Sequence, residues 1–123
     1  MTIIGRLAIG AALASLSFSA LAAETLSAAQ LQQRLAAGNS PLIIDVRSEQ
    51  DYLAGRLPGA RLISLPSLAS YTASLAGAQH ESILVYCGDD ACAKQAADTL
   101  EQAGFSKVLV LEGNYAAWDA LQK

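Results

Sequence analysis

Two cysteines stand close together in the segment VYCGDDAC, residues 85–92, and the chain has no others. Cys87 directly follows an apolar run, and two aspartates separate it from Cys92. A cysteine attacks as its thiolate, which neighbouring negative charge disfavours. Backbone N–H groups in a tight loop, together with the positive end of a following helix, can stabilise an anion instead. The segment therefore predicts a nucleophilic cysteine at position 87, with Gly88 allowing backbone angles that other residues resist.

The residues around this segment indicate a strand before it and a helix after it. The run SILVYC, residues 82–87, is apolar, rich in β-branched residues and bounded by polar ones, which is typical of a buried strand. The alanine-rich stretch 91–104 predicts a helix that ends at a glycine. Cys87 would then lie at the carboxyl end of a strand, where α/β proteins place their working loops.

Helices and buried apolar strands alternate along the rest of the chain. This order predicts an α/β fold with a mainly parallel central sheet flanked by helices. In the last helix, Trp118 and Leu121 are expected to point inward. The predicted strands are residues 42–46, 61–64, 82–87 and 107–113, and the predicted helices are residues 28–38, 48–55, 66–77, 91–104 and 114–123.

Three motifs, in this order and spacing, resemble those of the single-domain rhodaneses, which are sulfurtransferases. They are IIDVRSEQDYLAGRLPGARLI at 43–63, LVYCGDDAC at 84–92 and GFSKVLVLEGNYAAW at 104–118. The resemblance implies a rhodanese-like fold and covalent catalysis in two steps. Cys87 would take sulfane sulfur from thiosulfate or a persulfide, and then pass it from its own persulfide to cyanide or a thiol. It implies no metal and no organic cofactor.

The resemblance also implies which groups bind the transferred sulfur. Backbone N–H groups of the loop would stabilise the negative charge on it, as in an oxyanion hole. These groups belong to Gly88, Asp89, Asp90, Ala91 and Cys92.

The loop departs from the family pattern at three positions. Many members carry arginine where this chain has Cys92, and others have basic or small polar residues where it has Asp89 and Asp90. The aspartates would disfavour the thiolate and repel a dianionic donor. We therefore expect thiosulfate to be a poor donor, and a less charged or protein-bound donor to be a better one. Asp90 is expected to cap the following helix and Asp89 to be a solvated loop residue.

Three interpretations of Cys92 are open. It could be a small residue that packs quietly in the helix. It could be a resolving thiol that attacks an oxidised or persulfidated Cys87 and forms a disulfide. It could join Cys87 in binding a soft metal ion, although further ligands are lacking. A disulfide between the two would close a very small loop and restrain little of the unfolded chain.

Other candidate residues are given structural roles. His80, the only histidine, precedes the predicted strand 82–87 and would lie at the opposite end from Cys87, which argues against a Cys–His pair. Asp45 and Arg47 are expected to form an ion pair that holds the loops. Tyr86 is expected to pack in the core.

The same residues leave other functions open. A thiol–disulfide redox protein could use Cys87 and Cys92, although their spacing differs from the two-residue gap of thioredoxin-like motifs. A rhodanese-like domain could also serve as a non-catalytic binding module. A cysteine phosphatase or arsenate reductase is disfavoured, because the loop contains no arginine for bidentate oxyanion recognition.

Residues 1–22 have the pattern of a secretory signal peptide. Arg6 is followed by an uncharged apolar run at 7–21, and Ala20-Leu21-Ala22 offers a cleavage site. This predicts an exported, periplasmic protein that consists of a domain at 23–123 and has no stable membrane span after cleavage. The net charge of −3 argues against nucleic-acid binding. We expect a monomer that binds a small-molecule or protein-bound sulfur donor and a thiol or cyanide acceptor.

Overall fold

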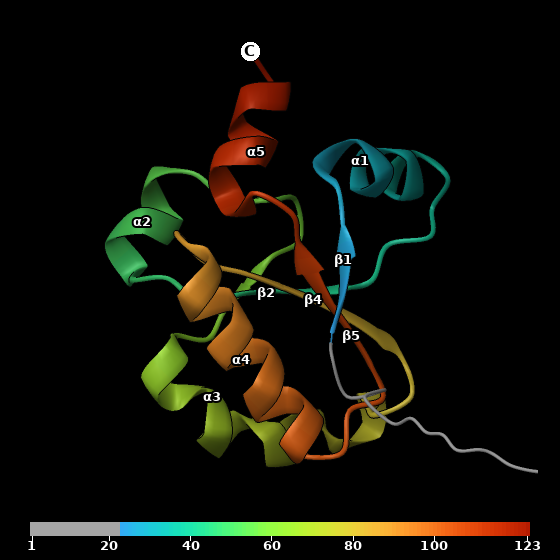
Figure 1. The fold of residues 1–123 in the computed structure, drawn as a ribbon, viewed down its shortest axis with the longest axis vertical. Helices are drawn as coiled ribbons and strands as arrows, with labels where there is room; N and C mark the ends of the chain where they lie inside the picture. The colour runs from blue at the N-terminus through green and yellow to red at the C-terminus, as the bar shows by residue number, and fades with distance from the viewer. Residues whose placement is uncertain (1–22) are drawn as a thin grey trace, which may run out of the picture.

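The computed structural model describes residues 23–123, so the predicted signal peptide lies outside the described residues. Five strands form one sheet in the order β1-β5-β4-β2-β3 (Figure 1). All four pairings are parallel, which confirms the predicted fold class. The carboxyl ends of the strands therefore meet at one edge of the sheet. The strands are β1 (Glu24–Leu26), β2 (Leu42–Asp45), β3 (Arg61–Leu62), β4 (Ser82–Tyr86) and β5 (Lys107–Leu111).

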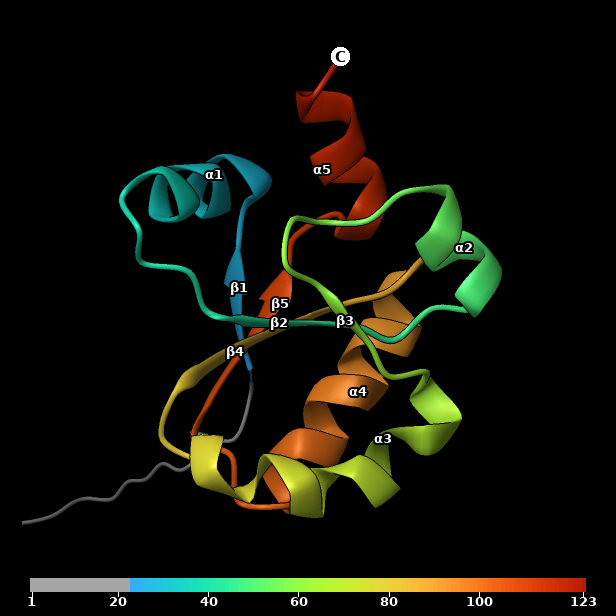
Figure 2. The ribbon, with the colours of Figure 1, turned by 180° about the vertical axis from the view of Figure 1, so that it is seen from behind.

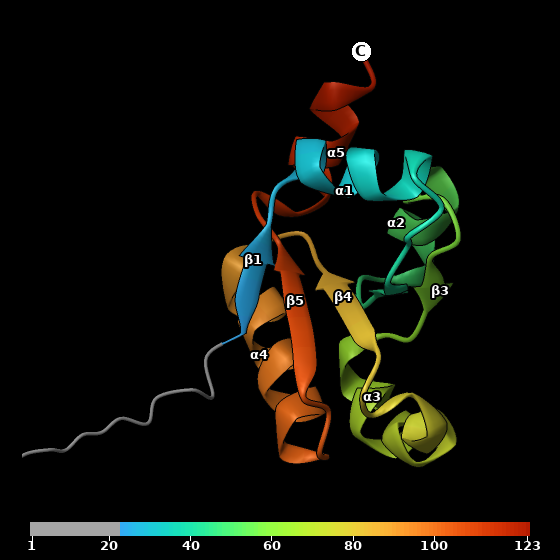
Figure 3. The same cartoon turned by 90° about the vertical axis from the view of Figure 1, so that its right-hand side faces the viewer.

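Helices cover both faces of the sheet and divide the core into two layers. The helices α3 and α4 pack together on one face, and α1 and α5 pack together on the other (Figures 1 and 3). Figure 2 shows β3 at the sheet edge beyond β2. The helices are α1 (Ala28–Ala36), α2 (Glu49–Ala54), α3 (Leu65–Tyr71), the 3₁₀ helix η1 (Thr72–Ala78), α4 (Asp90–Gln102) and α5 (Asn114–Leu121).

Strand β4 shows how the sequence assigns side chains to the two layers. Ile83, Val85 and Cys87 pack in the layer beneath α3 and α4, whereas Leu84 and Tyr86 pack in the opposite layer. This alternation is the two-residue period of a strand. It places the sulfur of Cys87 on the face from which α4 begins.

The segment after Pro66 differs from its prediction. One helix was expected over 66–77, but α3 ends at Tyr71 and the chain continues as η1. The hydroxyl of Thr72 donates to the carbonyl of Ala69 at 2.8 Å, and that of Ser74 donates to the carbonyl of Tyr71 at 2.7 Å. These bonds reach back three residues, the spacing of a 3₁₀ helix.

Two further features were not foreseen. Strand β1 is only three residues long and carries exposed Glu24 and Thr25, so its sequence has no apolar run that would predict a strand. Leu121 was expected to point inward, but it is 42% exposed, because α5 runs away from the sheet toward the C-terminus (Figure 1). Trp118 is buried, as predicted. Among residues 23–123, no helix combines the length and apolar character needed to cross a membrane.

Candidate active site at the carboxyl edge of the sheet

The two cysteines form a disulfide where β4 passes into α4. Cys87 follows the last residue of β4, and Cys92 lies in the first turn of α4. Their Cα atoms are 5.9 Å apart, within the usual span of a disulfide. Cys87 is only 7% exposed. The structure thus places the thiol of Cys92 within bonding reach of a nearly buried Cys87.

The loop between the cysteines presents backbone N–H groups. Within residues 23–123, the N–H groups of Gly88, Asp89, Asp90 and Ala91 have no hydrogen-bond acceptor. Three of them lie just before or at the start of α4, where the helix dipole is positive. The arrangement is suited to an anion close to the sulfur of Cys87.

Gly88 does not have the role expected from the sequence. Its φ lies outside the left-handed region, and a Cβ added there would meet no heavy atom within 4 Å. Neither the backbone conformation nor the space around this position therefore requires glycine.

Neither aspartate has its predicted role. Asp89, expected to be merely solvated, is the N-cap of α4, and its carboxylate accepts the N–H of Cys92 at 2.8 Å. Asp90, expected to be the cap, lies inside the first turn, and its carboxylate accepts from the amide of Asn114 at 2.8 Å. Asp89 adopts an extended backbone that brings its side chain to the helix. The cap occupies the N–H of Cys92, one of the five groups predicted to bind the transferred sulfur.

The turn between β5 and α5 is hydrogen-bonded to the cysteine loop. This contact was not predicted from the sequence. The side-chain oxygen of Asn114 accepts the backbone N–H of Cys87 at 3.2 Å. The N–H of Tyr115 donates to the carbonyl of Cys87 at 3.3 Å. Asn114 is 3% exposed and has a left-handed φ of 56°. The dipeptide Gly113-Asn114, where the predicted strand 107–113 ends, was the signal that could have marked this turn.

Asp45, Arg47 and Tyr86 form a buried polar group behind the cysteine loop. Arg47 makes a bidentate pair with Asp45, with the shortest distance 2.8 Å, which confirms the expected ion pair. Tyr86 was expected only to pack, but its hydroxyl donates to Asp45 at 2.7 Å and accepts the N–H of Leu57 at 3.2 Å. Burial raises the pKa of Tyr86, and its hydrogen bond to Asp45 contributes to the shift.

Arg47 also connects three segments at this edge of the sheet. Its guanidinium lies 4.2 Å from the ring centroid of Tyr115 and 5.4 Å from that of Tyr86. One of its N–H groups donates to the carbonyl of Gly55 at 2.6 Å. The loop after β2, the start of α5 and the end of α2 are thereby tied together. The side-chain hydrogen bonds of Arg47 thus go to the scaffold residues Asp45 and Gly55.

The remaining titratable candidates lie elsewhere. His80 is in the loop before β4, at the opposite end of the strand from Cys87, and its ring nitrogen lies 3.5 Å from the hydroxyl of Ser106. Over residues 23–123, no three His, Cys, Asp or Glu side chains gather closely enough to hold a metal ion.

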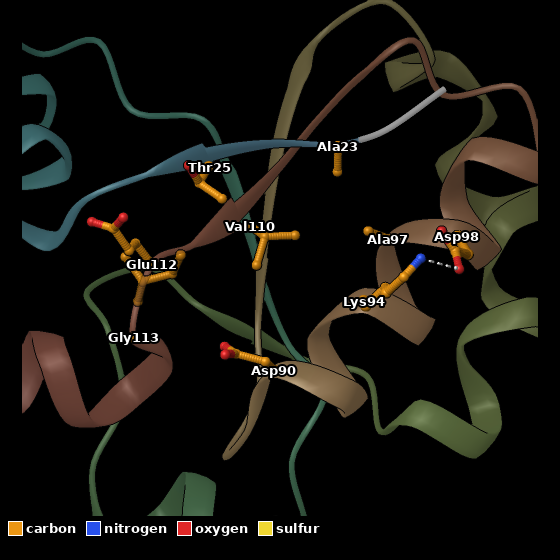
Figure 4. Close-up of a pocket in the computed structure, with 10 residues that line it drawn as sticks. Ala23, Thr25, Asp90, Lys94, Ala97, Asp98, Val110, Glu112 and Gly113 are labelled. Carbon is orange, nitrogen blue, oxygen red and sulfur yellow. Dashed lines mark hydrogen bonds and ion pairs between the residues drawn. The ribbon is translucent and has the colours of Figure 1, made fainter. Parts of the chain in front are cut away.

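A pocket of about 390 Å³ borders the cysteine loop. It lies between α4 and the strands β1 and β5, with Val110 and Ala97 on its floor and Lys94 at its side (Figure 4). Asp90 and Gly113 line its end nearest the loop, but Cys87 is not among the lining residues. The pocket therefore adjoins the candidate site without containing the nucleophile.

The molecule is thus an α/β protein with an all-parallel sheet and a cysteine loop at the carboxyl edge of that sheet. The model of the rhodanese-like domain family matches residues 27–121. The chain belongs to that family. The matched range contains all the helices and four of the five strands described above.

Curated relatives of the chain are sulfurtransferases. It is 28% identical to the thiosulfate sulfurtransferase GlpE of Pseudoalteromonas translucida over 79 residues, 64% of this chain and 73% of that protein. It is 28% identical to a sulfurtransferase of Allochromatium vinosum over 88 residues, 72% of this chain and 80% of that protein. The homology to sulfurtransferases is thus distant but extends over most of the domain.

Solved structures share the fold. The rhodanese-like domain of the Alr3790 protein from Anabaena sp. is 33% identical with a TM-score of 0.72, and the match covers 79% of this chain and 74% of that one. The human single-domain sulfurtransferase TSTD1 is 26% identical with a TM-score of 0.68, and the match covers 82% and 97%. These matches establish the rhodanese fold.

Proposed function

We propose that the protein is a sulfurtransferase that carries sulfane sulfur as a persulfide on Cys87. The observation that carries this proposal is the position of Cys87, at the end of β4 and beside four N–H groups that have no acceptor among residues 23–123. A cysteine thiolate would attack the outer sulfur of a donor, and the donor would lose its leaving group, sulfite in the case of thiosulfate. The N–H groups would stabilise the anionic outer sulfur until a thiol or cyanide removes it.

The charge of the loop favours weakly charged donors. Asp89 and Asp90 are both exposed, and no Lys or Arg side chain forms an ion pair with either of them among residues 23–123. Their negative charge repels a dianion such as thiosulfate more strongly than a neutral or singly charged group. A low-molecular-weight persulfide or a persulfide on another protein is therefore the proposed donor.

The test is a mass measurement on reduced protein. Residues 23–123 would be reduced, freed of reductant and treated with thiosulfate or glutathione persulfide before the intact mass is taken. A gain of one sulfur atom by the Cys92→Ser variant, but not by Cys87→Ser, supports the proposal. Absence of added sulfur on the Cys92→Ser variant with every donor contradicts it. Faster turnover of thiosulfate than of glutathione persulfide at equal concentration contradicts the proposed donor preference.

A second function is favoured by the disulfide itself. Cys87 and Cys92 could exchange electrons with a partner dithiol, as in thiol–disulfide redox proteins. This function needs no added sulfur. It predicts that the oxidised protein oxidises a dithiol, and that the reaction is lost in both single serine variants.

We also propose that the protein is exported after removal of residues 1–22. The supporting observation is the sequence pattern of Arg6, the apolar run and Ala20-Leu21-Ala22. Expression of the full chain in a bacterial host, followed by cell fractionation and N-terminal sequencing, tests it. A periplasmic product that begins at Ala23 is expected, and a cytoplasmic product that retains Met1 contradicts the proposal.

A further inference from the structure

We propose that Cys92 resolves the persulfide of Cys87 and releases its outer sulfur as hydrogen sulfide. This inference rests on the proposed function, since it needs a persulfide on Cys87. It adds a second outcome to sulfur transfer, in which the sulfur is reduced within the protein. The protein would then be a persulfide reductase as well as a sulfurtransferase.

The geometry that carries the inference is the bond between the two cysteines. A persulfide adds one sulfur beyond Sγ of Cys87, and that Sγ becomes the inner sulfur of the group. The disulfide shows that Sγ of Cys92 can reach this atom. Attack at the inner sulfur forms the same bond as in the structure. Attack at the outer sulfur would instead move the persulfide to Cys92.

The reaction is balanced within the protein. The sulfur of Cys92 forms a bond to Sγ of Cys87, and the bond from that Sγ to the outer sulfur breaks. The outer sulfur leaves with the electron pair as hydrosulfide and takes the proton of the Cys92 thiol. The two cysteines lose two electrons in forming the disulfide, and the sulfane sulfur gains them.

Access favours Cys92 over an external thiol for this step. In the disulfide form Cys87 is 7% exposed, and the approach to its Sγ is the one that Cys92 already occupies. Cys92 lies in the first turn of α4 and needs no diffusion, and a well-oriented intramolecular reactant has a high effective concentration. Its backbone N–H is fixed by Asp89, which holds the first turn of α4 in place.

The disulfide that results must be reduced before the next cycle. A disulfide sulfur is not a nucleophile, so Cys87 cannot accept sulfur in the oxidised protein. The chain has no third cysteine that could complete an internal exchange. The inference therefore includes an external dithiol, either a protein or a small molecule, that attacks the disulfide, leaves as its own disulfide and restores both thiols.

The experiment is a single turnover without an acceptor. Reduced wild type and the Cys92→Ser and Cys92→Ala variants would each be mixed with one equivalent of glutathione persulfide. Sulfide would be measured over time, and the intact mass would be taken after an acid quench. Wild type is expected to release one sulfide per chain, at least about 100-fold faster than either variant, and to lose two hydrogens. The variants are expected to keep the added sulfur.

The outcomes separate this inference from the proposed function. If the variants gain sulfur and pass it to cyanide while wild type forms neither sulfide nor a disulfide, the inference is wrong and the proposed function stands. Sulfide release at the same rate from wild type and both variants also overturns it, because the glutathione set free would then be the resolving thiol. If no variant with Cys87 gains sulfur, the proposed function fails first.

Discussion

The side-chain oxygen of Asn114 accepts the backbone N–H of Cys87 at 3.2 Å, while its amide donates to Asp90 at 2.8 Å. One buried side chain on the turn after β5 thus holds both ends of the loop that carries the nucleophile. The left-handed backbone of Asn114 is common for asparagine and glycine and costly for most other residues. Asn114 is therefore a positioning residue for Cys87, although no substrate needs to touch it.

Replacement of Asn114 should reduce the reactivity of Cys87. Asn114→Gly keeps the left-handed backbone and removes both hydrogen bonds, so the alkylation rate of Cys87 in a Cys92→Ser background should fall by about tenfold. Asn114→Asp retains an acceptor for Cys87 but places a carboxylate against Asp90. It should lower the free energy of unfolding, while the alkylation rate of Cys87 falls less than in Asn114→Gly. Iodoacetamide kinetics and urea unfolding measure the two effects. If Asn114→Gly lowers stability while alkylation is unchanged, Asn114 has only a structural role.

The local parts of the site could be predicted from the sequence, and the long-range contacts could not. The strand before Cys87, the helix after it and the pair of Asp45 and Arg47 depend on patterns within a few residues. The contact between Asn114 and Cys87 spans 27 residues and arises only when β4 and β5 pair. Neither the helical nor the strand periodicity of the sequence indicates such a contact.

The unexpected roles of Asp89 and Asp90 have the same cause. Either aspartate can cap a helix that begins one residue later, so local propensity does not distinguish them. Asn114 decides between them, because its amide binds Asp90 and leaves Asp89 to the N-cap position. Tertiary contact thus fixes a boundary that the sequence leaves uncertain by one residue.

The charge of Asp89 should limit the use of thiosulfate, and its cap should stabilise α4. Asp89→Asn keeps an N-cap and removes the charge, so the kcat/KM for thiosulfate should rise several-fold at low salt, and the gain should shrink as salt is added. Asp89→Ala should also lose about 0.5–2 kcal/mol of stability. Asp98→Asn on the same helix is the matched control for net charge. An equal gain in this control would show that the effect is not local.

Replacing only one residue of the buried pair Asp45 and Arg47 should strongly destabilise the folded protein. The side chains of Asp45 and Arg47 are 0% and 8% exposed, so Arg47→Met leaves a buried carboxylate without its charged partner. We expect a loss of about 3–5 kcal/mol in the free energy of unfolding. The double variant Asp45→Asn with Arg47→Met should cost less than the sum of the single variants. Urea unfolding of the wild type, the two single variants and the double variant gives the coupling energy between Asp45 and Arg47. Strictly additive losses would contradict this prediction.

The hydroxyl of Tyr86 should make stability depend on alkaline pH. Its pKa is raised above the ordinary value of 10.0 in the folded protein, first by burial and then by Asp45. In the unfolded chain Tyr86 ionises near pH 10, whereas in the folded protein it keeps its proton. The unfolded state therefore loses protons first, and stability falls as the pH rises above about 10.

Tyr86→Phe isolates this effect. Near neutral pH the variant should be less stable by about 1–3 kcal/mol, because Asp45 and the N–H of Leu57 lose a buried partner. By about pH 11 the difference from wild type should shrink by roughly 1.4 kcal/mol, since phenylalanine has no proton to lose in the unfolded state. Urea unfolding at a series of pH values measures both numbers. A difference that stays constant between about pH 8 and 11 would mean that Tyr86 ionises equally in both states, and that its buried hydrogen bonds do not hold the proton.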